Sequence, residues 1–424
     1  MWFGALIGTL GLGLPIAFVL LGAALVYFLQ ADGPSEIVMQ RFFAGIEPFP
    51  LLAVPLFILA GTVMARGGMA ERLLDFADGL VGHWKGGLGQ VNVVNSLIMG
   101  GMSGSANADA AVDAKILVPI MVKKNYGRDF SAALSACSGI IAPMIPPGIG
   151  LIMYGILAQV SIGRLFVAGI IPAFLLAISL GIVVRIIAGK RNYGSSRTHR
   201  MPRKDLLRVA GRASWTLFMP VLLIGGLRIG VFTPTELGAI AVAYALGVSA
   251  LVYREINMGS LVSILREAAL LSSIVLLIIG GASALGGVLV REQVPQLIFG
   301  GLTSLSDSAW VMLLAINIGL LLVGTLVEGT ALLVILAPML APLAAGLGVD
   351  PVQFGVMMVL NLTIGGLTPP IGTIMFTVCA ITGTTPRGYT REVWPMLIAV
   401  ISVLFLITFV PAFTLVLPGL VFGS

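Results

Sequence analysis

The stretch Ser138–Gly150, which reads SGIIAPMIPPGIG, decides the fold of this chain. It carries three prolines and three glycines inside an otherwise apolar run. Proline removes a backbone hydrogen-bond donor and ends a helix, whereas glycine lets the backbone approach a ligand closely. The stretch therefore predicts an apolar helix that is interrupted partway along its length.

The composition indicates a membrane protein with several helical spans. The 424 residues are 58% hydrophobic and 10% charged, whereas a soluble protein carries roughly 25% charged residues. Apolar runs of about 20 residues, long enough to cross ~30 Å of hydrocarbon, recur along the whole chain. No segment shows the sustained alternation of polar and apolar residues that membrane β-strands need. We therefore predict an all-α polytopic membrane protein.

The composition also excludes several classes of function. Two cysteines, Cys137 and Cys379, are too few for a disulfide framework or a thiolate metal site. The two histidines, His83 and His199, lie in polar segments, which leaves little for histidine-based catalysis or zinc binding. The net charge of +6 comes largely from one loop and does not indicate nucleic-acid binding.

That loop sets the predicted topology. Nine of the 24 Lys and Arg residues lie within residues 185–212, and the positive-inside bias places this basic loop in the cytoplasm. Residues 66–85 are amphipathic and are predicted to lie along the inner interface. Following the chain in both directions from this loop, we place the N-terminus in the cytoplasm and the C-terminus outside. The predicted crossings are residues 2–29, 48–65, 130–157, 164–189, 213–231, 237–253, 269–290, 353–381 and 392–418.

Two remaining pieces, residues 88–122 and 311–344, each have two short apolar arms around a small or polar centre. The arm Leu88–Gly101 would be ~21 Å long as a helix, which is too short to span the bilayer. Polar backbone at membrane depth must be buried in protein or line a cavity. We predict two re-entrant helical hairpins. The alternative is two ordinary tight spans, which would leave the loop with Lys123 and Lys124 on the wrong side.

The chain matches itself when it is shifted by 223 residues, and self-similarity at a long offset indicates a structural repeat. The loop after the first hairpin, residues 123–128, is basic, whereas residues 343–352 after the second carry no basic residue. An inverted-topology repeat, which is typical of secondary transporters, predicts that difference. The aligned pairs include Gly101 with Gly324, Leu117 with Leu340, Pro119 with Pro342, Pro146 with Pro369, Pro147 with Pro370, and Pro172 with Pro395.

The second copy of the interrupted stretch reads GGLTPPIG over residues 365–372. Unwound carbonyl groups can coordinate a cation, and the N-termini of half-helices can face an anion. The alternative is a pair of simple proline kinks, but a duplicated Pro-Pro with flanking glycine favours a binding site. Four asparagines are predicted interhelical hydrogen-bond partners, namely Asn92 and Asn95 on the first hairpin arm and Asn317 and Asn361 in the second half.

Three segments carry a resemblance to a known family. They read GGMSGSANADAAVDAKILVPIM (100–121), APMIPPGIGLIMYG (142–155) and LTPPIGTIMF (367–376). They closely resemble the large membrane subunit, of the DctM type, of tripartite ATP-independent periplasmic (TRAP) transporters. The resemblance covers essentially the whole chain and implies sodium-coupled uptake of an organic acid across the bacterial inner membrane.

The same resemblance implies two partners and a mechanism. The partners are a small four-helix membrane subunit of the DctQ type and a soluble periplasmic substrate-binding protein of the DctP type. Because the chain starts directly with the large subunit, we expect the small subunit to be a separate chain. The family works as an elevator, in which a transport domain slides against a scaffold. This implies scaffold helices and an interfacial arm in 1–87, a transport-domain hairpin and broken helix in 88–163, scaffold helices with the basic loop in 164–310, a second hairpin and broken helix in 311–386, and a C-terminal scaffold helix in 387–424.

The family pattern also places one sodium ion between each hairpin tip and the adjoining broken helix. Hydroxyl, amide and carbonyl oxygens suit this hard cation. The first site is expected to use Ser103, Gly104, Ser105 and Asn107 with carbonyls between Ala142 and Pro147, including Pro146. The second is expected to use Thr325, Glu328, Gly329 and Thr330 with Gly366, Thr368, Pro369 and Thr373. No other cofactor is expected.

The substrate carboxylate is expected between the two tips, near their backbone donors, and no arginine lies in either motif to clamp it. Asp109 and Glu328 would be charged groups at membrane depth, which are costly and functional by default. For Asp109 the alternative is an N-cap of the second hairpin arm, and the two roles can coexist. The candidate substrate-binding residues are Ser105, Asn107, Asp109, Pro147, Gly148, Thr330 and Pro370.

Three other functions compete with this hypothesis. Broken helices also build channels. An intramembrane enzyme would need a convergent nucleophile and base, and no His or Cys accompanies the polar motifs. An autonomous sodium/anion symporter of a related fold, which needs no binding protein, is the main alternative. The organic acid itself stays open among C4-dicarboxylates, sialic acid, other sugar acids and keto acids.

Overall fold

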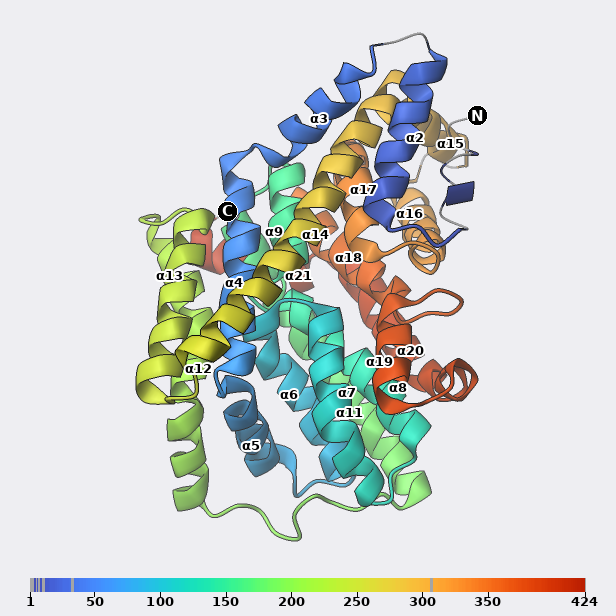
Figure 1. The fold of residues 1–424 in the computed structure, drawn as a ribbon. Helices are drawn as coiled ribbons and strands as arrows, with labels where there is room; N and C mark the ends of the chain where they lie inside the picture. The colour runs from blue at the N-terminus through green and yellow to red at the C-terminus, as the bar shows by residue number, and fades with distance from the viewer. Residues whose placement is uncertain are drawn as a thin grey trace.

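The computed structural model describes the chain except residues 1–3, 5, 7, 10–11, 32–33, 306–307 and 424. The described residues form helices joined by turns, with no strand among them (Figure 1). Seven of these helices are long and apolar enough to cross a membrane, and an eighth crossing is counted when the bent pair α8–α9 is taken as one span. The prediction of an all-α polytopic membrane protein is confirmed.

The N-terminal region differs from the prediction of one continuous crossing at 2–29. Residues 12–15 form a turn, in which Gly13 has a φ of +74° and Pro15 lacks an amide donor. Helix α2 therefore starts at Ile16, after the turn, whereas the described residues Gly4, Leu6, Gly8 and Thr9 before the turn are also helical. The region comprises α2 (Ile16–Gln30), α3 (Glu36–Ile46), the 3-10 turn η1 (Phe49–Leu52), α4 (Ala53–Arg66) and the amphipathic arm α5 (Met69–Val81).

The central helices follow the prediction with shifted ends. Helix α12 starts at Arg203, so the chain between α11 and α12 leaves helical conformation only over residues 192–202 of the predicted basic loop. Helix α14 crosses the molecule diagonally and packs on α2, α3, α4 and α17 (Figure 1). The helices are α10 (Ile162–Ala168), α11 (Ile170–Arg191), α12 (Arg203–Ile229), α13 (Pro234–Gly247) with its π-helical turn η3 (Val248–Val252), α14 (Met258–Arg291) and α15 (Val294–Leu305).

The predicted last crossing, residues 392–418, is wrong as one continuous helix. Helix α20 (Pro386–Phe409) ends before Val410, which is extended with a φ of −123° and a ψ of 91°. Pro411 follows directly, and a proline disfavours helical conformation in the residue before it. A second helix, α21 (Ala412–Phe422), then completes the chain.

The two hairpins and the two broken helices have matching boundaries. Helix α7 covers 106–123, and adding 223 to both ends gives 329–346, which are the bounds of α17. Helix α8 starts at 128, and adding 223 gives 351, the start of α18. The first set is α6 (Gly87–Ser103), α7 (Ala106–Lys123), α8 (Arg128–Gly139), η2 (Ala142–Met144) and α9 (Ile149–Leu157), and the second is α16 (Ala309–Gly324), α17 (Gly329–Gly346), α18 (Pro351–Gly365) and α19 (Thr373–Thr382).

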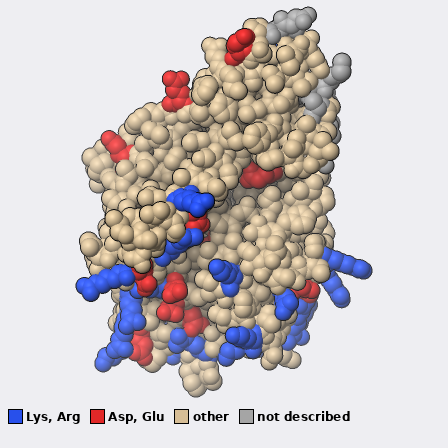
Figure 2. Space-filling model, viewed as in Figure 1, with Lys and Arg blue, Asp and Glu red and all other residues tan. Residues whose placement is uncertain are grey.

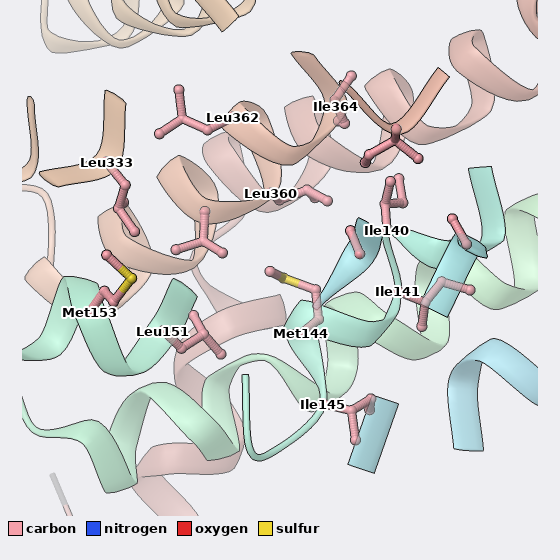
Figure 3. Packing of buried hydrophobic residues seen from close by; sticks show 14 of the residues in the cluster. Ile140, Ile141, Met144, Ile145, Leu151, Met153, Leu333, Leu360, Leu362 and Ile364 are labelled. Atoms are coloured by element: carbon pink, nitrogen blue, oxygen red, sulfur yellow. The ribbon is translucent and has the colours of Figure 1, made fainter. Parts of the chain in front are cut away.

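Both helix interruptions occur where the sequence predicts them. The first breaks between Gly139 and Ile149 with a bend of 45°, and the second breaks between Gly365 and Thr373. The residues around the first break are buried, and Figure 3 shows Ile140, Met144 and Ile145 packed among apolar side chains. Helix length does not distinguish hairpin arms from membrane-crossing helices as clearly as predicted. The hairpin arm α17 has 18 residues and is itself long and apolar enough to cross a membrane.

Charged side chains are distributed unevenly over the surface. In the view of Figure 2, Lys and Arg gather over the lower half, whereas the upper third carries Asp and Glu but no Lys or Arg. The lower end holds α5, the connection between α11 and α12, and the first turns of α12 (Figure 1). The basic cluster at residues 185–212 thus contributes to one end of the molecule.

The close contact between α16 and α18 in the second repeat can be tested by substitution. A Cβ atom on Gly365 would lie 2.5 Å from the carbonyl carbon of Gly324, so α16 and α18 cannot keep their distance if a side chain is added. We expect Gly365→Ala to cost about 1–3 kcal/mol of unfolding free energy through overpacking. Thermal unfolding of the detergent-purified protein, followed by tryptophan fluorescence, should show a lower midpoint.

The matched control is Gly319→Ala. Gly319 lies on α16 with no other atom within 4 Å of its added Cβ, and alanine is the better helix former, so its midpoint should stay equal or rise slightly. An unchanged midpoint in Gly365→Ala would contradict the close packing of α16 against α18.

Candidate functional site

One cavity of about 160 Å³ lies between the two hairpin tips and the two helix breaks. Both halves of the chain contribute to it, and α14 adds one residue. Its lining residues are Gly104, Ser105, Ala106, Asn107, Pro143, Ile149, Gly150, Met153, Val275, Glu328, Gly329, Thr330, Leu333, Val359, Leu362, Thr363, Gly366, Thr373 and Ile374.

Each hairpin tip is hydrogen bonded to the adjoining helix break through the backbone. The amide of Ile149 donates to the carbonyl oxygen of Gly104 at 3.2 Å. In the second half, the amide of Ile371 donates to the carbonyl oxygen of Thr325 at 3.2 Å. The tips therefore satisfy backbone groups that the breaks leave without helical partners.

The first tip requires glycine at position 104. Gly104 has a φ of +55°, and a Cβ atom there would overlap the carbonyl oxygen of Pro147. The tip backbone can therefore contact the break directly only because this residue has no side chain.

Four helices begin at the cavity. The lining includes the first residues of α7, α9, α17 and α19, which start at Ala106, Ile149, Gly329 and Thr373. The first N–H groups of a helix have no partner inside it, and the helix N-terminus carries partial positive charge. The cavity therefore lies at four helix ends with partial positive charge, which suits an anion, while the first-turn amides of Ile149, Ile374 and Met375 already donate to the carbonyl groups of Gly104 and Gly366.

The predicted site residues fall into two groups. Those that line the cavity are Gly104, Ser105, Asn107, Glu328, Gly329, Thr330, Gly366 and Thr373. Those that do not line it are Ser103, Asp109, Ala142, Pro146, Pro147, Gly148, Thr325, Thr368, Pro369 and Pro370. Several of the second group belong to the contact between tip and break, since Ala142 packs against Gly100 and the Pro147 carbonyl faces Gly104.

The N-cap interpretation of Asp109 is wrong. The cap of α7 is Ser105, whose hydroxyl accepts from the amide of Ala108 at 3.5 Å, and the cap of α17 is Glu328, at the equivalent position 223 residues later. Asp109 lies one turn inside α7 and is fully buried. Neither oxygen of its carboxyl group has a hydrogen-bond partner among the described residues.

The predicted asparagine contacts between helices are confirmed. Asn92 donates to Ser135 at 2.7 Å, and Asn361 donates to the Asn317 side chain at 2.9 Å. In the first hairpin, Asn95 and Ser96 of α6 both donate to the carboxyl group of Asp113 on α7, at 2.8 and 2.9 Å. Asp113 thereby joins the two arms of the hairpin in the interior.

The residues at the first tip fit a sodium ion. The side-chain oxygen of Asn107 is buried and has no hydrogen-bond partner among the described residues, and the Ser105 hydroxyl and several backbone carbonyls lie close by in the chain. At the second tip, the carboxylate of Glu328 and the hydroxyl of Thr330 are suitable oxygens. Gly366 fits least well, because its carbonyl already accepts from the amides of Ile374 and Met375 at 3.0 and 3.2 Å.

Sequence reasoning missed the apolar part of the lining. Met153, Leu333 and Leu362 were not among the predicted residues, and Figure 3 shows the side chains of Met153 and Leu333 turned toward one another. Val275 comes from the middle of α14, far from both motifs in the sequence. An apolar residue inside an apolar helix carries no signal in the sequence, so only the fold places it at the cavity.

Comparison with known proteins gives a consistent result. The family model of the DctM component of tripartite ATP-independent periplasmic transporters matches residues 3–413. The chain is 39% identical, over 99% of both chains, to the sialic acid TRAP transporter large permease protein SiaM of Vibrio cholerae. It is 37% identical to the 2,3-diketo-L-gulonate TRAP transporter large permease protein YiaN of Escherichia coli, over 97% of this chain and 96% of that protein. It is 34% identical to the C4-dicarboxylate TRAP transporter large permease protein DctM of Rhodobacter capsulatus, over 99% and 98%.

The Asp113 network gives a testable prediction about the first hairpin. Replacing Asp113 with Ala would leave the buried Ser96 hydroxyl without this acceptor and would leave the Asn95 amide only the weak acceptor Met99 Sδ at 3.0 Å, at about 1–3 kcal/mol for an unsatisfied buried group. We expect a clearly lower thermal unfolding midpoint. The control is Asp205→Ala, since Asp205 is half exposed and its pair with Arg208 is long at 3.9 Å, so the midpoint should not change. Equal midpoints for the two variants would argue against a structural role of Asp113.

Proposed function

We propose that this chain, which belongs to the DctM component family of tripartite ATP-independent periplasmic transporters, carries out sodium-coupled uptake of an organic acid. It is a multi-pass membrane protein and a transporter permease subunit, not an enzyme. Large permease subunits of this family work with a small subunit of the DctQ type and a periplasmic binding protein of the DctP type. The bacterial inner membrane is the location that follows.

The observation that carries the proposal is the convergence of four helix N-termini on one cavity. A carboxylate bound there would accept hydrogen bonds from the first backbone N–H groups of α7 and α17, which start at Ala106 and Gly329. No arginine or lysine lines the cavity among the described residues, so helix ends and bound cations supply the positive potential.

We place one sodium ion at each tip. At the first tip the ligands would be Asn107 and Ser105 with carbonyls of the adjoining break. At the second tip they would be Glu328, Thr330 and Thr373. Sodium bound at these positions would supply positive charge next to the substrate carboxylate and would link its binding to the ion gradient.

The cavity also supports an elevator mechanism. Except for Val275, all its lining residues belong to segments 88–163 and 311–386, which we propose as the transport domain. A backbone hydrogen bond joins tip and break within each segment, and the two segments pack on one another through α7 and α8 with α19 and through α9 with α17 and α18. A substrate in the cavity would therefore travel with this unit, while α14 and the other helices of 1–87, 164–310 and 387–424 would form the scaffold.

The charge distribution supports an orientation. Lys and Arg gather at the end of the molecule that holds the connection between α11 and α12, so we place this end in the cytoplasm (Figure 2). The C-terminus would then be periplasmic, whereas α2 lies in the upper half of Figure 1, away from the end placed in the cytoplasm, so this placement does not support the predicted cytoplasmic N-terminus. With this placement the two repeats have opposite orientations, and α6–α7 and α16–α17 are re-entrant hairpins.

Uptake in proteoliposomes tests the proposal. The chain would be purified with its small partner, reconstituted, and supplied with an inward sodium gradient, a labelled organic acid and the binding protein. We expect accumulation only when both sodium and the binding protein are present, and weaker sodium dependence in Ser105→Ala and Thr373→Ala. Uptake without the binding protein would favour the autonomous symporter, and uptake without sodium would exclude the coupling.

A sharper prediction concerns the unpartnered oxygen of Asn107. Asn107→Ala removes a buried oxygen at the first tip, so the sodium concentration for half-maximal uptake should rise roughly tenfold or more. The measurement is initial uptake rate against sodium concentration. The control is Ser273→Ala on the exposed face of α14, where the hydroxyl donates only to the Ala269 carbonyl. An unchanged sodium dependence in Asn107→Ala would remove this residue from the proposed site.

A further inference from the structure

The cavity is polar where helices begin and apolar one turn further along. Ile149 and Gly329 are the first residues of α9 and α17, and both line the cavity near the tips. Met153 and Leu333 follow four residues later on the same helices and line it as well. Since four residues are about one helical turn, Met153 and Leu333 lie on the same faces of α9 and α17 as the residues that start these helices, and Figure 3 shows their two side chains.

The ionisable side-chain charge in the lining of the cavity is negative. Glu328 is the one ionisable side chain among its described lining residues. The carboxylate accepts from the Thr330 hydroxyl at 2.7 Å and from the Ala331 amide at 3.0 Å. A substrate with two carboxylates would bring its second negative charge into a cavity that contains Glu328 and no basic side chain. With one sodium ion at each tip, two positive charges balance Glu328 and a single carboxylate, and a dianion would leave one negative charge in excess.

Away from the tips the cavity offers little to a polyhydroxylated substrate, since Ser105, Asn107 and Thr373 are the side chains proposed to hold sodium. The Thr363 hydroxyl donates to the carbonyl of Val359 at 2.7 Å, and the Thr330 hydroxyl donates to Glu328. The wall formed by Val275, Leu362 and Ile374 carries no side-chain donor or acceptor. Hydroxyl groups placed against this wall would lose their water partners without gaining protein partners, which weakens binding.

We infer that the substrate is an aliphatic monocarboxylate, with its carboxylate at the starts of α7 and α17 and a short apolar body against Met153, Leu333 and Leu362. The inference rests on the proposed function, because it assigns the substrate class of the same cavity. It separates this chain from the relatives named for sialic acid, 2,3-diketo-L-gulonate and C4-dicarboxylates.

The test compares two acids of nearly the same shape. 4-Methylpentanoate ends in an isopropyl group where succinate ends in a second carboxylate. Binding to the purified complex of the chain with its small partner would be measured as the rise in unfolding midpoint with acid concentration, in sodium and in choline. In sodium, we expect half-saturation by 4-methylpentanoate at a concentration roughly 100-fold lower than by succinate, because a second negative charge is poorly accommodated. Gluconate should bind as weakly as succinate, and choline should abolish the difference.

The outcomes separate this inference from the proposed function. Sodium-dependent binding in which succinate or gluconate equals or exceeds 4-methylpentanoate would overturn the substrate class and leave the sodium-coupled transporter standing. No sodium-dependent shift with any of the three acids would overturn both. Direct measurement on the membrane complex keeps the selectivity of the binding protein out of the result.

A variant of the wall gives an independent check. Met153→Gln keeps the side-chain length and adds an amide, so half-saturation by 4-methylpentanoate should rise roughly tenfold. Met39→Gln is the control, since Met39 is exposed on α3, and it should bind as the unmodified protein does. Unchanged binding in Met153→Gln would place the apolar body elsewhere and overturn the inference.

Discussion

The structure depends on one constraint, which is that unwound backbone in an apolar interior must find hydrogen-bond partners inside the protein. The two Pro-Pro breaks expose such backbone, and the hairpin tips supply partners through Ile149 to Gly104 and Ile371 to Thr325. Because each tip satisfies a break, hairpin and broken helix form one unit in each half. The cavity is a consequence, since helices that start at a tip and helices that restart after a break all begin at the same place.

The repeat explains why the cavity receives the same kind of element from both halves. Ser105 and Glu328 are the N-caps of α7 and α17 and stand 223 residues apart, yet one is a neutral hydroxyl and the other a carboxylate. The geometry of the repeat is thus retained while the chemistry of its two tips differs. The first tip offers an unpartnered amide oxygen at Asn107, and the second offers a carboxylate that already holds two donors. The two proposed cation sites are therefore not equivalent in charge.

Sequence reasoning predicted those features that the positions of proline, glycine and charged residues indicate directly. The breaks at 140–148 and 366–372, the hairpin boundaries and the repeat are of this kind. It failed where the outcome depends on packing. An aspartate near a helix start looks like a cap, and only the structure shows that Ser105 takes that role and that Asp109 is buried. The prediction of one helix over 392–418 relied on hydropathy and gave too little weight to Pro411, which follows the end of α20. Val275 reaches the cavity through the diagonal path of α14, which no local pattern records.

The electrostatics of the cavity would give the proposed sodium coupling a physical reason. A transport domain that carries its cavity through the membrane carries Glu328 with it, and a net charge in a low-dielectric setting is costly. A carboxylate substrate bound without cations would add a second negative charge and raise that cost. Cations at the tips without substrate would leave positive charge in excess. The cavity approaches neutrality with two cations, Glu328 and one carboxylate, and also with one cation and Glu328 alone. A carboxylate substrate bound with fewer than two cations would leave the cavity negative, so its charge would disfavour movement of the substrate without sodium.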